Sequence, residues 1–248
     1  MSYREGAEKY YDLFGDKDDV GFYLGLAKEH GGRALELGVG TARLAIQLAR
    51  AGVETWGVDN SPHMLSAARK SLSRESAEVR GRVHLELADV RGLDLGERFG
   101  LVYFPSFSFD HLLTREDQCS ALEAIRLHVA PGGVYAFDLA HVPEVSRDSG
   151  WFVQRKPLDE RRMVVRTGHH HTDPRSMRMS IDLWYELFED GRIVERFFEG
   201  GDVHIHSKEG IVELLSENGF RVRALYGGHD RRPFEEGSEM MVIVAEPV

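Results

Sequence analysis

The sequence predicts an α/β fold: a doubly wound, mostly parallel sheet of seven strands, with an inserted antiparallel β-meander. Two features of the chain predict it. Short apolar strands alternate with helices between residues 33 and 140, and long stretches of alternating and β-branched residues run from Trp151 to His206. Short apolar strands separated by helices are typical of a parallel sheet that is covered on both faces.

The first part of the chain contains five expected strands and three expected helices. The strands lie at 33–37, 55–58, 83–87, 101–104 and 134–138, and the helices near 41–51, 62–74 and 115–129. Ser61 before Pro62 marks a helix start, because the hydroxyl can cap the helix and proline suits its first turn. The segment Pro131-Gly-Gly133 is expected to end the third helix and to turn the chain into the fifth strand.

The second part of the chain is expected to form antiparallel strands and then to return to the first sheet. The antiparallel strands are represented by 163–166, 179–188 and 193–198. Glu189-Asp-Gly191 has the composition of a hairpin turn between two of them. A helix capped by Ser207 and two further strands, at 221–226 and 240–245, complete the chain.

Composition excludes several classes of partner. The chain of 248 residues has a formal net charge of −10, and an acidic surface repels the phosphates of nucleic acid. No apolar run reaches the roughly 18 residues of a membrane span, and the N-terminus lacks the apolar core of a signal peptide. The single cysteine, Cys119, cannot form an internal disulfide. We therefore expect a cytoplasmic monomer or homodimer without a nucleic-acid or membrane partner.

The first strand ends in a glycine turn that indicates a ligand site. The segment Ala34-Leu-Glu-Leu-Gly-Val-Gly-Thr-Ala-Arg43 runs from an apolar strand through a turn into a helix. In an open parallel sheet, ligands bind outside the carboxyl ends of the strands, where the strand order reverses. Gly38 and Gly40 can adopt backbone conformations closed to other residues and let a ligand approach the main chain.

Carboxylates at the ends of the next strands define the kind of ligand. Asp59 ends the second strand, where it can accept both hydroxyls of a ribose. Asp89 ends the third strand, where it can accept from the exocyclic amine of adenine. Together with the acidic Glu36 before the glycine turn, these residues describe a pocket for a nucleoside-containing cofactor.

Two cofactors compete for this pocket. A nicotinamide dinucleotide needs a third glycine where Arg43 stands, and Glu36 would place negative charge near its pyrophosphate. S-adenosylmethionine has no phosphate, and its sulfonium and amine are cationic, so an acid beside the turn suits it. The residues favour S-adenosylmethionine. An NAD(P)-dependent Rossmann oxidoreductase and a non-catalytic cofactor-binding module stay open as alternatives.

Several segments resemble the motifs of one enzyme family. Glu36-Leu-Gly-Val-Gly-Thr41 resembles motif I of class I S-adenosylmethionine-dependent methyltransferases, with Ala42 where a third glycine usually stands. Val58-Asp-Asn-Ser-Pro-His-Met-Leu65 and Ala88-Asp-Val90 resemble the two motifs that follow. Leu127-His-Val-Ala-Pro-Gly-Gly-Val134 resembles the entry to the fifth strand.

The resemblance implies a Rossmann-like, small-molecule methyltransferase, similar to those that N-methylate amino sugars and glycine. It implies an N-terminal helical lid (1–32), a cofactor-binding domain (33–142 and 207–248) and an inserted antiparallel sheet on the substrate side (143–206). Cofactor contacts are implied for Glu36, Gly38, Gly40, Asp59, Asn60, Met64, Asp89, Val90 and Phe104. A small-molecule amine is the first choice of methyl acceptor, and a hydroxyl is the second.

Two segments are expected to act on the acceptor. Phe104-Pro-Ser-Phe-Ser-Phe-Asp-His111 resembles a segment that passes beside the methyl group, and His111 is the candidate base or positioning group, because histidine titrates near neutrality. Asp110 is the neighbouring alternative, and helix capping is the structural alternative for His111. The segment Tyr10-Tyr-Asp-Leu-Phe14 resembles a lid in which Tyr11 faces the site, with core packing as its alternative.

The histidines of the insertion do not predict a metal site. His169-His-His171 lie on one strand, where adjacent side chains point to opposite faces, so the three cannot converge on one ion. His204 and His206 share a face but have no evident third ligand. His204, Trp184 and Tyr185 are instead candidates for substrate contact.

Overall fold

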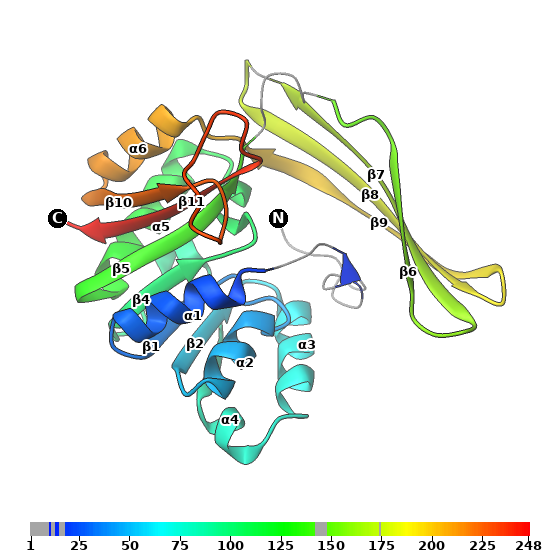
Figure 1. The fold of residues 1–248 in the computed structure, drawn as a ribbon, viewed down its shortest axis with the longest axis horizontal. Coiled ribbons are helices and arrows are strands. Elements are labelled where there is room, and N and C mark those ends of the chain that lie inside the picture. The colour runs from blue at the N-terminus through cyan, green and yellow to red at the C-terminus, as the bar shows by residue number, and fades with distance from the viewer. Residues whose placement is uncertain (1–9, 11–12, 15–17, 142–147, 174) are drawn as a thin grey trace.

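The structure, a computed structural model, describes residues 10, 13–14, 18–141, 148–173 and 175–248. These residues form two sheets (Figure 1). The larger sheet contains β1 (Arg33–Leu37), β2 (Glu54–Asp59), β3 (Val83–Leu87), β4 (Phe99–Phe104), β5 (Val129–Ala140), β10 (Phe220–Tyr226) and β11 (Met240–Pro247). The smaller sheet contains β6 (Phe152–Pro157), β7 (Arg162–Asp173), β8 (Arg178–Glu189) and β9 (Arg192–His204). The helices are α1 (Val20–Glu29), α2 (Arg43–Arg50), α3 (Pro62–Leu72), α4 (Ala77–Gly81), α5 (Arg115–His128), α6 (Lys208–Glu217) and the short 3₁₀ turns η3 (Val90–Gly92) and η4 (Ser108–His111).

The larger sheet confirms the predicted seven-stranded, mostly parallel architecture. Its strand order is β10-β11-β5-β4-β1-β2-β3, and β11 runs antiparallel to both β5 and β10. β1 pairs in parallel with β2 on one side and with β4 on the other. The chain therefore fills one half of the sheet, crosses back, and fills the other half, so the order reverses between β1 and β4. That reversal leaves a crevice at the carboxyl ends of these two strands.

Helices cover both faces of the larger sheet, as its apolar strands require. Tyr23 and Leu26 of α1 and Leu44 and Leu48 of α2 pack on one face. Helices α5 and α6 pack on the opposite face, where they enclose the larger apolar cluster. α3 begins after Ser61, whose hydroxyl accepts the N–H of Met64, as the Ser-Pro sequence predicted.

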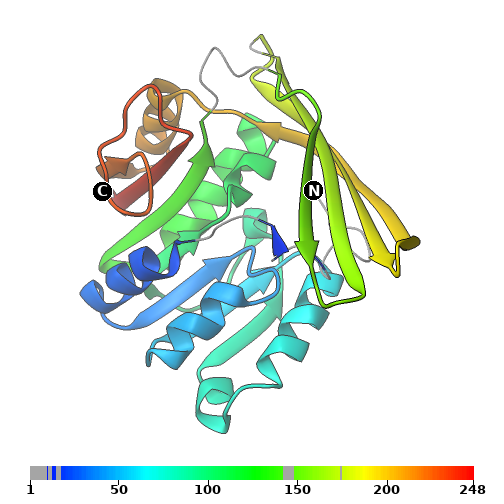
Figure 2. The ribbon, with the colours of Figure 1, turned by 45° about the vertical axis from the view of Figure 1, so that its right-hand side comes forward.

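The smaller sheet confirms the predicted antiparallel insertion and extends it by one strand. Figures 1 and 2 show it as a separate arm between β5 and α6. The predicted hairpin turn joins β8 to β9, with Asp190 and Gly191 at φ 49° and 77°. Two positive φ values in a two-residue turn match the right-handed twist of the flanking strands.

Three expectations about boundaries are corrected. β6 was not predicted, because all its residues after Phe152 are exposed and carry no apolar alternation. The Pro131-Gly-Gly133 segment does not end α5, which already ends at His128. The segment lies within β5, where Gly132 has a φ of 77°. The described N-terminal helix is only α1, whereas Tyr10 and Phe14 pack on the smaller sheet, where Tyr10 stacks on Phe197 at 5.8 Å.

A buried polar network lies between α1 and the larger sheet. The Tyr103 hydroxyl donates to Glu36 Oε2 at 2.9 Å, and the Tyr23 hydroxyl donates to Asp138 Oδ2 at 2.8 Å. All four side chains are at most 3% exposed. Burial raises the pKa of the Glu36 carboxyl to about 8, and the hydrogen bond from Tyr103 and the charge of Arg43 oppose that rise only in part. Glu36 therefore keeps its proton at neutral pH in the cofactor-free protein.

The network predicts how folding stability depends on pH. The folded pKa of Glu36, about 8, exceeds the ordinary value of 4.5 for a glutamate, so the protonated carboxyl stabilises the fold at acidic pH. This contribution is lost as the pH rises through about 8. Replacing Glu36→Gln should flatten the fall in urea midpoint between pH 5 and 9. The matched control is Glu86→Gln, at an exposed position on β3. Equal pH slopes in the wild type and the Glu36 variant would contradict the assignment.

A close approach of α1 to β4 depends on a glycine. A Cβ built on Gly100 would lie 1.6 Å from the backbone carbonyl oxygen of His30, just after α1. Replacing Gly100→Ala should therefore lower the free energy of unfolding by about 1–3 kcal/mol, because backbone atoms must move. Gly21→Ala, on the exposed side of α1 with nothing near its Cβ, should raise it by about 0.5–1 kcal/mol. Urea unfolding of the two variants measures both effects.

Candidate active site

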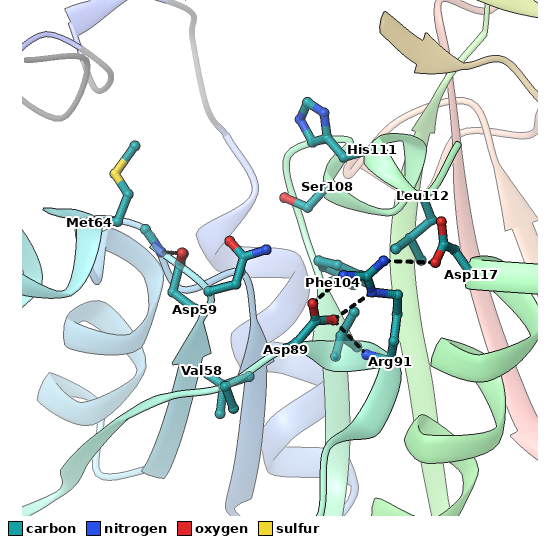
Figure 3. Close-up of a pocket in the computed structure, with 15 residues that line it drawn as sticks. Val58, Asp59, Met64, Asp89, Arg91, Phe104, Ser108, His111, Leu112 and Asp117 are labelled. Carbon is teal, nitrogen blue, oxygen red and sulfur yellow. Dashed lines mark hydrogen bonds and ion pairs between the residues drawn. The ribbon is translucent and has the colours of Figure 1, made fainter. Parts of the chain in front are cut away.

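A first cavity of about 160 Å³ lies in the crevice where the strand order reverses (Figure 3). Residues from the ends of β1, β2, β3 and β4 line it: Gly38, Gly40, Val58, Asp59, Asn60, Met64, Ala88, Asp89, Val90, Arg91, Phe104, Ser108, His111, Leu112 and Asp117. Met64 and Asp59 lie on one side, and Ser108 and His111 on the other. Of the nine residues for which cofactor contacts were predicted, eight line this cavity.

The ninth residue, Glu36, lies outside the lining. It is buried on β1 behind the glycine turn and is bonded to Tyr103. Asp59 and Asp89 both line the cavity, but each has protein partners already. Sequence reasoning placed these acids at strand ends correctly, and their partners became evident only in three dimensions.

The glycine turn after β1 has the open backbone that the sequence predicted. Gly38 and Gly40 have φ values of 65° and 54°, in the left-handed region that favours glycine. A Cβ on Gly38 would lie 3.2 Å from the Phe104 ring, so the turn leaves room for a ligand only while this residue has no side chain. Ala42 also adopts a positive φ, of 63°, at the position where a third glycine was expected.

Asp59 joins the glycine turn to the start of α3. Its Oδ2 accepts the N–H of Gly40 at 2.9 Å, and its Oδ1 accepts the N–H of Ser61 at 2.8 Å. Burial raises the pKa of the Asp59 carboxyl, and these backbone hydrogen bonds oppose the rise. A carboxylate has about four lone-pair sites, and the backbone N–H groups of Gly40, Ser61 and Asn60 leave at least one of them free. The carboxylate can therefore hold its loop and still accept a hydroxyl.

Asp89 is part of an ion-pair network that the sequence did not predict (Figure 3). The guanidinium of Arg91 binds both of its carboxylate oxygens, at 2.9 and 2.6 Å, and also binds Asp117 of α5 at 2.8 Å. The hydrogen bond from Arg91 lowers the pKa of Asp89. This pairing ties η3 to the start of α5 and orients one wall of the cavity.

A second cavity, of about 390 Å³, lies between the larger sheet and the inner face of the inserted sheet. Its lining is Phe14, Asp18, Asp19, Ser106, Phe107, Asp110, His111, Asp138, Ala140, Arg166, Met179, Ile181, Leu183, Tyr185, Glu199, Gly200, Val203, His229 and Met240. The wall on the side of the inserted sheet is mostly apolar, whereas the side near β4 and β5 is acidic. Among the described residues, His111 alone lines both cavities.

His111 stands at the boundary of the two cavities because a tight turn places it there. Ser106 and Phe107 both have positive φ values, of 62° and 59°, directly before η4. The N–H of Phe107 donates to Asp138 Oδ1 at 2.6 Å, which holds this strained turn against β5. Burial lowers the pKa of the His111 imidazole to about 4, so the ring is neutral near pH 7.

Two buried aspartates in the second cavity differ in how fully they are bonded. Asp138 accepts from Tyr23, from the N–H of Phe107 and from His229 when its Nε2 is protonated. Asp110 accepts one hydrogen bond, from the N–H of Ala140 at 2.9 Å. Asp138 lies near the end of β5, as Asp59 lies at the end of β2, so the rule of acids at strand ends could have identified it.

Of the other described candidates for acceptor contact, Tyr185 lines a cavity, and Trp184 and His204 do not. Tyr185 lines the second cavity, whereas Trp184 lies on the opposite face of β8, is 40% exposed and does not line the cavity. His204 is absent from both linings and packs against His206 with ring centroids 4.4 Å apart. Tyr11 lies outside the described residues.

The described residues contain neither a candidate metal site nor a helix that could span a membrane. No group of three or more His, Cys, Asp or Glu side chains there could hold a metal ion. No described helix has the length and apolar character that a bilayer crossing requires.

Known proteins share both the fold and the domain that carries the first cavity. A family model described as a methyltransferase domain matches residues 34–133. The cypemycin N-terminal methyltransferase of Streptomyces sp is 26% identical over 218 residues, which are 87% of this chain and 83% of that protein. The structure of the CcbJ methyltransferase from Streptomyces caelestis is similar at a TM-score of 0.84 and 21% identity, over 100% of this chain and 98% of the other.

A structure with bound cofactor is also similar. CalS10, an amino pentose methyltransferase from Micromonospora echinaspora with bound S-adenosylmethionine, aligns at a TM-score of 0.78 and 21% identity over 100% of this chain and 99% of the other. At these identities the two structures show a shared fold. The matched domain contains the glycine turn, Asp59 and Asp89, and its first cavity has the open turn and the carboxylate acceptor that a nucleoside cofactor without phosphates requires. The chain therefore contains a methyltransferase domain and has the fold of class I S-adenosylmethionine-dependent methyltransferases.

Proposed function

We propose that the protein transfers a methyl group to an amine of a small molecule held in the second cavity. The observation that carries this proposal is the position of His111, which lies in the wall of both cavities. A methyl donor in the first cavity and an acceptor in the second would meet beside this side chain. The inserted sheet closes the acceptor side, which favours a small molecule over an extended polymer.

The proposed cofactor contacts follow from the first cavity. Asp59 would accept a ribose hydroxyl with a remaining lone pair, and the glycine turn would lie against the methionine moiety. Met64 and Val90, on the walls formed by α3 and η3, would contact adenine. Arg91 donates to both oxygens of Asp89, so Asp89 would accept a hydrogen bond from the adenine amine only through a lone pair that Arg91 leaves free.

Acidic side chains favour an amine over a hydroxyl as the acceptor. Asp18, Asp19, Asp110, Asp138 and Glu199 line the second cavity, and Arg166 is the one arginine or lysine among its lining residues. Such a lining attracts a cation and disfavours an anion. The two relatives named as acting on an N-terminus and on an amino pentose support the same choice. A hydroxyl acceptor is the second choice.

The chemistry asks little of the protein beyond alignment and proton transfer. When bound, S-adenosylmethionine supplies a methyl carbon already activated by its sulfonium. The protein must place the acceptor nitrogen about 3–3.5 Å from that carbon and leave a lone pair on it. His111, which is neutral above about pH 4, can orient the nitrogen and accept a proton from it.

Cofactor binding tests the role of Asp59. Replacing Asp59→Asn should weaken calorimetric binding of S-adenosylmethionine and S-adenosylhomocysteine by about 10- to 100-fold, since each charged hydrogen bond contributes about 1.5–3 kcal/mol. The asparagine oxygen can still accept the N–H of Gly40, which holds the glycine turn, but the amide nitrogen cannot accept the N–H of Ser61. Asp94→Asn, at an exposed position, is the control and should bind like the wild type. Undiminished binding by the Asp59 variant would refute this contact.

Turnover tests the role of His111. Replacing His111→Gln should lower kcat about 100-fold or more with an amine acceptor, while the affinity for S-adenosylhomocysteine stays within about threefold. His63→Gln, at an exposed position in the first turn of α3, is the matched control. Because the imidazole stays neutral down to about pH 4, the wild-type rate should show no loss near pH 6.5 attributable to this histidine.

The choice of acceptor is tested by matched pairs of amines and alcohols. Each pair shares a carbon skeleton, and formation of methylated product is followed by mass spectrometry with S-adenosylmethionine as donor. We expect methylation of amines. Methylation confined to the alcohols would overturn the amine proposal and favour O-methylation.

A further inference from the structure

One oxygen of a buried carboxyl in the second cavity has no partner. Asp110 is 0% exposed and belongs to the cavity lining. Its Oδ2 accepts the N–H of Ala140, and its Oδ1 has no hydrogen-bond partner among the described residues. Buried carboxyl oxygens in folded proteins are almost always paired, so an unpaired one on a residue that lines a cavity needs an explanation.

A purely structural role explains only one of the two Asp110 oxygens, Oδ2. The bond to Ala140 joins η4 to the end of β5, and an amide oxygen would make it equally well. Asp138, which lies on β5 with Ala140, differs from Asp110 because both of its carboxylate oxygens accept hydrogen bonds from the protein. Asp110 bears the cost of burying a carboxyl without this compensation.

The surroundings of Asp110 fit a cation. The ionisable groups that line the cavity with it, besides His111, are Asp138 on β5, Arg166 on β7, Glu199 on β9, His229 in the β10–β11 loop, and Asp18 and Asp19 before α1. Arg43 pairs with both carboxylate oxygens of Asp19, and the remaining carboxyl groups still outnumber the cationic groups in this set. Burial and the charge of Asp138 hold the pKa of Asp110 well above its usual range, so the empty cavity favours the neutral carboxyl.

We propose that Oδ1 of Asp110 binds the cationic nitrogen of the methyl acceptor and takes its first proton. This inference rests on the proposed function and adds the residue that recognises the acceptor. On binding, the ammonium displaces the carboxyl proton into solvent. The ammonium N–H bond then breaks, its electron pair stays on nitrogen, and its proton moves to Oδ1.

The remaining steps balance with groups already in the site. The nitrogen lone pair attacks the methyl carbon of the cofactor, and the electrons of the breaking C–S bond go to sulfur, which leaves S-adenosylhomocysteine. The methylated nitrogen carries a positive charge and one proton too many, and neutral His111 is placed to accept that proton. Asp110 and His111, adjacent in η4, thus serve successive proton transfers.

The opposite wall defines the rest of the acceptor. Leu183, Tyr185 and Val203 of the inserted sheet and Phe14 before α1 present apolar surface to the cavity. A cavity of about 390 Å³ accommodates an acceptor well beyond the size of glycine. The acceptor class is therefore an amine whose cationic nitrogen is attached to a largely apolar body.

The test compares two probes that differ only in the nitrogen. Phenethylamine and 2-phenylethanol are titrated into the protein saturated with S-adenosylhomocysteine, for the wild type, Asp110→Asn and Asp182→Asn. The asparagine keeps the bond to Ala140, and Asp182 is an exposed control on β8. We expect the wild type and the control to bind the amine at least tenfold more tightly than the alcohol, and Asp110→Asn to lose that preference. Absent or equal wild-type binding of the two probes, or an amine preference that survives in Asp110→Asn, overturns the inference.

Proton counting supplies a readout that does not depend on the variant. Calorimetry in buffers of different ionisation enthalpy should show about one proton released per phenethylamine bound to the wild type near pH 6, and none for the alcohol. No release with the amine overturns the proton transfer to Asp110. An amine-selective, proton-releasing site in a protein that methylates only alcohols would leave amine binding by Asp110 standing. It would overturn the proposed function and the role of Asp110 in the methylation step.

Discussion

Carboxylates that accept backbone N–H groups from neighbouring loops hold this site together. Asp59, at the end of β2, binds the turn after β1 through Gly40, and Asp138, near the end of β5, binds the loop after β4 through Phe107. These loops lie side by side only because the strand order reverses between β1 and β4. Burial makes each bond necessary, since an unpaired carboxylate would be costly there. The same bonds hold Gly38 and His111 in the positions from which the cavities are built.

The degree of pairing separates structural acids from acids available to a ligand. Asp138 accepts a hydrogen bond from the Tyr23 hydroxyl, and Glu36 accepts one from the Tyr103 hydroxyl. Both carboxyls are therefore part of the buried network beneath α1. Asp59 retains part of its accepting capacity after its backbone hydrogen bonds, and one oxygen of Asp110 has no hydrogen-bond partner among the described residues. The two incompletely bonded carboxyls lie in different cavities, which fits a cofactor in one and an acceptor in the other.

The inserted sheet supplies the apolar wall of the second cavity. Because side chains alternate along a strand, β8 turns Leu183 and Tyr185 toward the cavity and leaves Trp184 on the outer face. Phe14, from before α1, packs on the same inner face, with its ring 6.0 Å from that of Tyr185. The N-terminal segment and the insertion, far apart in sequence, therefore build one apolar wall, opposite the acids beside β4 and β5.

The sequence alone determined the class of fold, the glycine turn and the acids at the strand ends, because these depend on local periodicity and on residues adjacent in the chain. It also determined the antiparallel insertion and its hairpin turn at Asp190. Only the tertiary structure decided that Arg91 forms an ion pair with Asp89 and that Glu36 is buried behind the glycine turn. It also decided that one oxygen of Asp110 has no hydrogen-bond partner among the described residues. Hydrogen-bond pairing and burial arise between segments that the chain brings together from a distance, and no local pattern encodes which donor a buried carboxylate will meet.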